Sequence, residues 1–255
     1  MKKTICVISA LITLASFSLR AYAAECSWYI KRNGTHRPSC PVSEEIMDKY
    51  DVYFLDKKLN DASEEKRLYL TFDLGYVNDS VLRILDVLEE SETPAAFFIL
   101  DHVIYKNADM LKRMVNDGHL ICNHTKRHKN LSNSTEEEIR ADLGALESLY
   151  KEKTGREMSK YFRFPEGKYS EAALASICKM GYKTIFWSFA YADWDNANQP
   201  KEEAAIKKIL DNTHNGAVIL LHPTSATNAK ILGRVIAEWR KMGYTFGTLD
   251  DLTSQ

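Results

Sequence analysis

The sequence predicts an α/β fold in which short parallel strands alternate with helices. Seven apolar runs recur along the chain, and helix-like stretches lie between them. Short loops between strand and helix signals favour parallel strands joined by right-handed crossovers. Five of the runs lead into a reactive side chain: Asp73, His124, Arg163, Asp193 and His222. Because the active sites of parallel α/β proteins collect at the C-terminal ends of strands, this pattern favours an enzyme over a binding module.

Each expected element follows from local signals. Strands are expected at 68–71, 95–100, 120–122, 161–162, 185–187, 217–221 and 244–248. Helices are expected at 79–90, 107–117, 136–153, 171–180, 201–213 and 228–242. Thr135 and Glu138 have capping-box spacing at the start of the third helix. Glycines that tolerate the left-handed conformation follow four of the helices: Gly118, Gly155, Gly181 and Gly243. Seven strands and six helices indicate a barrel short of eight units or, alternatively, an open sheet.

Length and charge limit the class of protein. A chain of 255 residues has room for one main domain with a full core. The formal net charge of -1 and the absence of a long basic run argue against a nucleic-acid-binding protein. We expect the main domain at 67–252, preceded by a polar N-terminal extension at 25–66 with a helix near 42–50. We also expect a monomer.

The first 24 residues have the pattern of a secretory signal peptide. Lys2 and Lys3 precede an apolar stretch at 5–17, and Ala21-Tyr22-Ala23 fits a cleavage site. The alternative is an uncleaved anchor, but the apolar stretch is shorter than the roughly 20 residues that a membrane span needs. The sequence therefore predicts a secreted or cell-envelope protein with no stable membrane span after cleavage.

Four cysteines follow the predicted signal peptide. Outside the cytoplasm, a bridge between Cys26 and Cys40 is allowed, with unpaired thiols as the alternative. Cys122 and Cys178 lie in apolar runs, and we expect both to be small core residues.

His124 and His128 form the candidate metal site. Imidazoles four residues apart can face one cation, and this pair directly follows a predicted strand. Most such pairs occur by chance, so the position after the strand is what favours a ligand role.

The remaining reactive residues suggest hydrolysis. Asp73 and His222 can supply a base that takes a proton from water and an acid that protonates the leaving group. Arg163 can hold a carboxylate and keep it ionised. Trp194 offers a flat apolar face for a sugar ring. The alternatives are a turn-capping Asp, a core His, a surface ion pair and a buried Trp.

The ordered set TFD-x-G, H-T-x-x-H, R-x-P-x-G, D-W and L-x-H resembles the polysaccharide deacetylases of the NodB homology type, carbohydrate esterase family four. The resemblance spans roughly Arg67 to Leu252. The 186–194 block, Gly75-Tyr76 and the segment around Trp28 are most similar to the δ-lactam-biosynthetic de-N-acetylases of spore peptidoglycan, which act on muramic acid without peptide. The resemblance implies a deformed (β/α)7 barrel that acts on peptidoglycan glycan strands.

The resemblance also implies a role for each motif residue. Asp73 would be the base and His222 the acid, while Arg163 would hold Asp73 and Asp193 would orient His222. A second group has roles in binding: His124 and His128 for a divalent cation, zinc first and cobalt or manganese as alternatives, and Trp194, Pro165 and Gly167 for substrate.

Leu74 departs from the family pattern. The family usually has a carboxylate here as a third metal ligand, and a leucine side chain cannot ligate. Three functions therefore stay open: an N-acetylmuramic acid de-N-acetylase, a deacetylase of N-acetylglucosamine, chitin or xylan, and an inactive glycan-binding homologue. Lys126, Arg127 and Lys168 lie beside motif loops and are candidates to pair with a lactyl carboxylate, although each is individually more typical of a solvated surface residue.

Overall fold

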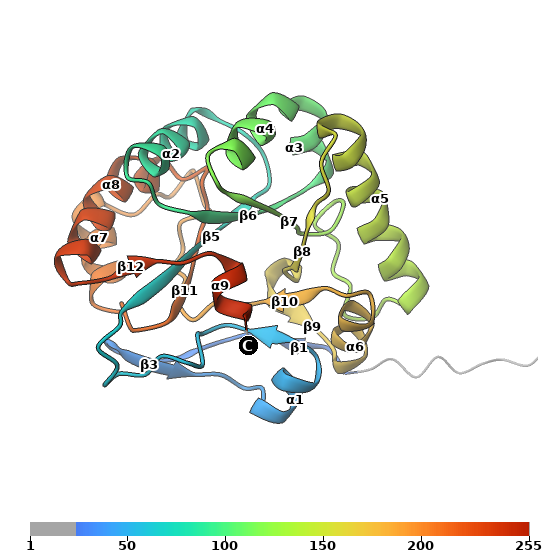
Figure 1. Cartoon of the computed structure of the whole chain (residues 1–255), viewed down its shortest axis with the longest axis horizontal. Coiled ribbons are helices and arrows are strands. Elements are labelled where there is room, and N and C mark those ends of the chain that lie inside the picture. Colours follow the sequence, from blue (N-terminus) through green and yellow to red (C-terminus); the bar gives the residue numbers. More distant parts are fainter. Residues whose placement is uncertain (1–23, 255) are drawn as a thin grey trace, which may run out of the picture.

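A curled sheet of eight parallel strands lies at the centre of the computed structural model, which describes residues 24–254 (Figure 1). The strands lie in the order β11 (Ala217–Leu221), β5 (Arg67–Leu74), β6 (Ala95–Ile99), β7 (Leu120–Asn123), β8 (Ser159–Phe162), β10 (Lys183–Ile185) and β4 (Val52–Tyr53), and β12 (Thr245–Phe246) pairs with β5. Seven of these strands overlap the predicted runs. The α/β prediction with parallel strands is confirmed.

The strand β4 was not predicted, and it comes from the N-terminal segment 25–66. It pairs with β10, and an isolated bridge joins Leu55 to Ala217 of β11. The N-terminal segment therefore contributes to the main sheet as well as packing on it. The other elements of this segment are β1 (Cys26–Ser27), β2 (Lys31–Asn33), β3 (His36–Ser39) and α1 (Glu44–Lys49). The boundary between residues 66 and 67 stays a prediction.

Helices surround the curled sheet, as Figure 1 shows. The predicted ones are α2 (Asp79–Glu90), α4 (Ala108–Asn116), α5 (Glu136–Thr154), α6 (Glu171–Lys179), α7 (Glu202–Leu210) and α8 (Ala226–Lys241). The capping box of Thr135 and Glu138 is present at the start of α5. The short helices α3 (Asp101–Lys106) and α9 (Leu249–Thr253) were missed, because one or two turns show too little periodicity to be predicted.

The two faces of β5 have different surroundings. Leu68, Leu70, Phe72 and Leu74 belong to a core that includes residues of α2 and α8, whereas Tyr69 packs with Phe98 and Cys122 in the interior of the curled sheet. Successive side chains of a strand point to opposite faces. Asp73 therefore faces the interior at the C-terminal end of β5, and Leu74 faces the helices.

None of the cysteines in the described part of the chain forms a disulfide: Cys26, Cys40, Cys122 and Cys178 are all free thiols. Cys122 is buried as expected, but Cys178 is only partly buried, because it lies in the last turn of α6.

The predicted signal peptide, except Ala24, lies outside the described residues. Within 24–254, no helix is long and apolar enough to cross a membrane.

Candidate active site

An ion pair between Asp73 and Arg163 joins the ends of β5 and β8. Arg163 Nη1 donates to Asp73 Oδ1 at 2.8 Å, and the arginine side chain is fully buried. Its other donors reach the Ile185 carbonyl and Thr71 Oγ1, both at 2.9 Å. Burial would raise the pKa of Asp73, but the charge of Arg163 and the neighbouring histidines His124 and His222 lower it below its ordinary value. Asp73 is therefore held as a carboxylate.

A second pair joins His222, at the end of β11, to the buried Asp193. His222 Nδ1–H donates to Asp193 Oδ1 at 2.7 Å, and the His222 backbone N–H donates to Asp193 Oδ2 at 2.8 Å. Burial would lower the pKa of His222, but the hydrogen bond and charge of Asp193, with the charge of Asp73, raise it. The imidazole therefore tends to keep the proton that a general acid must deliver.

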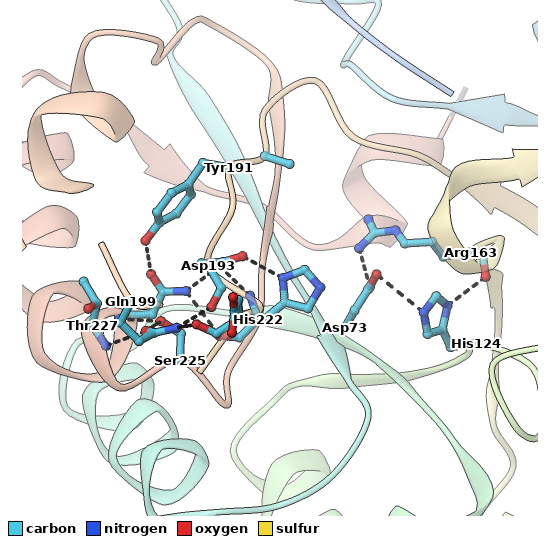
Figure 2. A network of polar contacts seen from close by, with 12 residues as sticks. Asp73, His124, Arg163, Tyr191, Asp193, Gln199, His222, Ser225 and Thr227 are labelled. Carbon is cyan, nitrogen blue, oxygen red and sulfur yellow. Dashed lines mark hydrogen bonds and ion pairs between the residues drawn. The ribbon is translucent and has the colours of Figure 1, made fainter. Parts of the chain in front are cut away.

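Asn228 of α8 is a site residue that the sequence did not reveal. Its Nδ2 donates to Asp193 Oδ2 at 2.6 Å, and its Oδ1 accepts from the hydroxyl of Tyr191. Figure 2 shows Tyr191, Asp193 and His222 on one side and the group of Asp73, His124 and Arg163 on the other. Asn228 follows no recognisable motif, so only the packing of α8 against the 191–193 loop reveals it.

His124 has the environment of a metal-binding imidazole. Its Nδ1–H donates to the Arg163 carbonyl at 2.9 Å, which leaves the Nε2 lone pair directed toward Asp73 Oδ2, 3.5 Å away. Burial lowers the pKa of His124 to about 4, so the ring is neutral near pH 7. The ring of His128 lies close by, with a centroid distance of 5.0 Å. A backbone carbonyl that fixes the tautomer in this way is usual for histidine ligands.

These donors fit a divalent cation, but with one protein ligand fewer than is usual. Catalytic zinc normally has three protein ligands. Among residues 24–254, no group of three or more His, Cys, Asp and Glu side chains is arranged to hold a metal. Leu74 is fully buried in the core on the helix side of β5, so the position that carries a carboxylate in the family does not face the histidines.

Leu74→Asp therefore tests the orientation of position 74. We expect the free energy of unfolding to fall by at least about 2–5 kcal/mol, the cost of truncating a core leucine, because a carboxylate would also be buried without a partner. Metal affinity should not increase. Leu74→Met is the matched control and should cost less than about 1.5 kcal/mol. Urea unfolding and metal titration measure both effects, and tighter metal binding by Leu74→Asp would show that the side chain faces the cation.

A cavity of about 750 Å³ contains the reactive ends of both pairs. It is lined by Asp73, Gly75, Tyr76, His128, Glu166, Trp187, Ala190, Tyr191, Trp194, Leu220, His222 and Thr224. The predicted base and acid therefore open onto one space. Trp194 is 64% exposed at this cavity, so the alternative of a buried tryptophan does not hold.

The R-x-P-x-G loop contacts the cavity through a residue that was not predicted. Pro165 and Gly167 are buried and do not line the cavity, whereas Glu166 between them does. We propose that Pro165 and Gly167 shape the loop and leave direct contact with substrate to Glu166. Within 24–254, five non-glycine residues have a left-handed backbone, and three of them, Thr125, His128 and Glu166, lie in the loops of this site.

The three candidate cations do not line the cavity. Lys168 forms an ion pair with Glu166 at 2.6 Å, and Arg127 forms one with Asp101 at 3.3 Å. Lys126 is held through its backbone N–H, which donates to Asp142. Of the three, Lys168 is paired with a residue that lines the cavity, Glu166.

Asp193→Asn tests how the acid is tuned. Loss of the negative charge should lower the pKa of His222, because the charge and hydrogen bond of Asp193 raise it. The alkaline limb of the kcat/KM profile should then move to lower pH, while the acid limb, set by Asp73, stays in place. Rates of acetate release across the pH range measure this shift. An unchanged alkaline limb would mean that another group supplies the proton.

Comparisons with known proteins agree with this geometry. The family profile for polysaccharide deacetylase matches residues 60–185. The chain is 34% identical to the peptidoglycan-N-acetylmuramic acid deacetylase PdaA of Bacillus subtilis (strain 168), over 98% of this chain and 94% of that protein. It is 30% identical to a peptidoglycan-N-acetylglucosamine deacetylase of Bacillus cereus, over 74% of this chain and 89% of that protein.

The solved structure of Bacillus subtilis PdaA, a family 4 carbohydrate esterase, matches with a TM-score of 0.83 and covers 89% of this chain and 96% of that chain. The chain belongs to the polysaccharide deacetylase family. This membership confirms the predicted deformed (β/α)7 barrel and the predicted enzyme class, a hydrolase acting on amide N-acetyl groups.

Proposed function

We propose that this protein hydrolyses the N-acetyl amide of N-acetylmuramic acid in peptidoglycan glycan strands. One observation carries the proposal: a buried carboxylate paired with Arg163 and an imidazole paired with Asp193 open onto one cavity beside the exposed Trp194. The pKa of Asp73 is lowered and the pKa of His222 is raised, so an ionised carboxylate and a protonated imidazole can coexist in the cavity. The likeness to PdaA of Bacillus subtilis supports muramic acid as the sugar.

In the proposed reaction, two residues transfer protons and two others position them. Asp73 takes a proton from water, which then attacks the acetyl carbonyl carbon. His222 gives a proton to the sugar nitrogen as the carbon–nitrogen bond breaks, releasing acetate and a free amine. Arg163 keeps Asp73 ionised and oriented through its hydrogen bond. Asp193 accepts a hydrogen bond from Nδ1–H of His222, so Nε2 is the atom that gives the proton to the sugar nitrogen.

His124 and His128 would hold the divalent cation, with zinc first and cobalt or manganese as alternatives. When bound, it would polarise the acetyl carbonyl and lower the pKa of water. With two imidazoles and no third protein ligand among the described residues, the cation should be held weakly and be removed readily by a chelator.

Muramic acid adds a further chemical feature, the lactyl carboxylate. In a sugar stripped of peptide, the newly released amine lies close to this carboxyl group, so closure to the δ-lactam is favoured by proximity. A cavity shaped for a bare lactyl group would exclude the bulkier peptide-bearing sugar. The proposed substrate is therefore peptide-free muramic acid, as in the spore cortex. We further propose that the protein is a secreted monomer that acts in the cell envelope.

Acetate release from three substrates tests this function. We expect the fastest rate on peptide-free peptidoglycan strands, a slower rate on peptide-bearing strands and on N-acetylglucosamine oligomers, and loss of activity with a chelator. Restoration by added zinc, and failure of restoration in a His124→Ala, His128→Ala variant, would tie the metal to the two histidines.

The rival functions give different results in the same assay. Faster acetate release from chitin oligomers or acetylated xylan would favour another substrate of the family. Glycan binding without acetate release from any substrate would favour an inactive homologue. Equal rates with and without chelator would mean that the reaction does not need a metal.

A further inference from the structure

Trp28, in the N-terminal segment, contacts both loops that surround Arg163. Its backbone N–H donates to the Gly167 carbonyl at 2.8 Å, and its indole Nε1–H donates to the Trp187 carbonyl at 3.0 Å. Its ring stacks on Phe186 with a centroid distance of 4.3 Å and an interplanar angle of 4°. Trp28 is 5% exposed, so these contacts are largely shielded from solvent.

The segment contacted on one side, the end of β10 and the residues that follow it, carries two carbonyls that accept from Arg163. Arg163 Nε donates to the Ile185 carbonyl at 2.9 Å, and Nη2 donates to the Phe186 carbonyl at 3.3 Å. Trp28 holds the next carbonyl, that of Trp187, and the ring of Phe186. Displacement of this segment would move two acceptors of Arg163 and, through Arg163, the carboxylate of Asp73.

The loop contacted on the other side follows Arg163 in the chain. Gly167 has φ of +67°, and a Cβ atom there would lie 2.9 Å from Trp28 Cβ and 3.0 Å from the ring of Trp187. The glycine of the R-x-P-x-G motif is therefore required by a left-handed backbone and by the close approach of two tryptophans. Strand β1 extends this contact by pairing with β9 (Lys168–Tyr169).

We propose that Trp28 is a positioning residue that holds Arg163 and the cavity wall at Trp187 in their productive places. This inference rests on the proposed function for its catalytic consequence, since Arg163 acts through Asp73. It gives the N-terminal segment a part in catalysis although Trp28 does not line the cavity and is 135 positions before Arg163 in the chain.

Trp28→Phe tests the proposal with a matched control. Phenylalanine keeps a ring to stack on Phe186 but cannot donate to the Trp187 carbonyl. Trp239 of α8 is also buried and donates to Thr213 Oγ1 at 2.8 Å, away from the cavity. We expect both Trp28→Phe and Trp239→Phe to lower the unfolding midpoint. Only Trp28→Phe should lower kcat, by about three- to tenfold, with little change in KM. This factor corresponds to the free energy that one buried hydrogen bond contributes. Equal kcat in the two variants would overturn the proposal.

A double-mutant cycle separates positioning from a general loss of stability. If Trp28 acts through Arg163, then Trp28→Phe should not lower kcat further in an Arg163→Ala background. Full multiplication of the two losses would show that Trp28 acts independently of Arg163 and would contradict the proposal.

A spectroscopic measurement does not depend on activity. With 5-fluorotryptophan in the four tryptophan positions, Trp28→Phe should shift the ¹⁹F resonance of Trp187, assigned with Trp187→Phe, whereas Trp239→Phe should not. An unshifted Trp187 resonance would overturn the positioning role. If the wild-type protein released no acetate from any glycan, the proposed function would fail, and this shift would still decide whether Trp28 holds the cavity wall.

Discussion

Replacement of Asp73 by asparagine is expected to reduce kcat by at least about 10²–10⁴-fold, because the variant cannot take a proton from water. The Oδ1 atom of asparagine can still accept from Arg163 Nη1, so the fold should be retained. The measurements are initial rates of acetate release and the thermal unfolding midpoint. Asp86→Asn is the matched control, since Asp86 also accepts from an arginine, Arg113, but on the surface.

Comparison of Asp73→Asn with Asp86→Asn shows whether Asp73 is the base. Asp86→Asn should keep the wild-type rate, because surface ion pairs contribute little to stability. If Asp73→Asn kept more than a tenth of the wild-type rate while remaining folded, another group would have to be the base.

Replacement of His222 by alanine is expected to reduce amide hydrolysis by a similar factor, about 10²–10⁴-fold, because the leaving amine must be protonated. An aryl acetate ester has a leaving group that departs without a proton. His222→Ala should therefore keep most of its rate on such an ester, whereas Asp73→Asn should lose activity on both substrates. His102→Ala, which changes a partly exposed histidine outside the cavity, is the control.

The ester comparison separates two roles for His222. Equal losses on the amide and the ester would mean that His222 orients water or substrate and is not the acid. A selective loss on the amide would assign the proton to its Nε2 atom.

The gathering of the reactive residues was predictable because it depends on local patterns. Parallel strands place their C-terminal ends along one edge, so Asp73 at the end of β5 and His222 at the end of β11 were expected to meet. The structure brings both to one cavity, with Arg163 bound to Asp73. The alternation of side chains along β5 would also have placed Leu74 on the opposite face from Asp73.

The remaining features depend on contacts between distant segments. Strand β4 has two residues, and nothing in their sequence indicates that they pair with β10. Asn228 supports Asp193 from a helix without a motif. The contact of Trp28 with Trp187 joins two segments that are 159 positions apart in the chain, and sequence spacing carries no information about such packing.

Mass spectrometry of digested glycan strands would show whether this protein removes the acetyl group of muramic acid. Peptide-free strands treated with the wild-type protein should give muramic acid residues that have lost one acetyl group, with or without the further loss of water that marks a lactam. The glucosamine residues should lose acetyl groups more slowly than the muramic acid residues, and Asp73→Asn should leave both sugars unchanged. Loss of acetyl from glucosamine with muramic acid intact would show that the protein is not a muramic acid deacetylase.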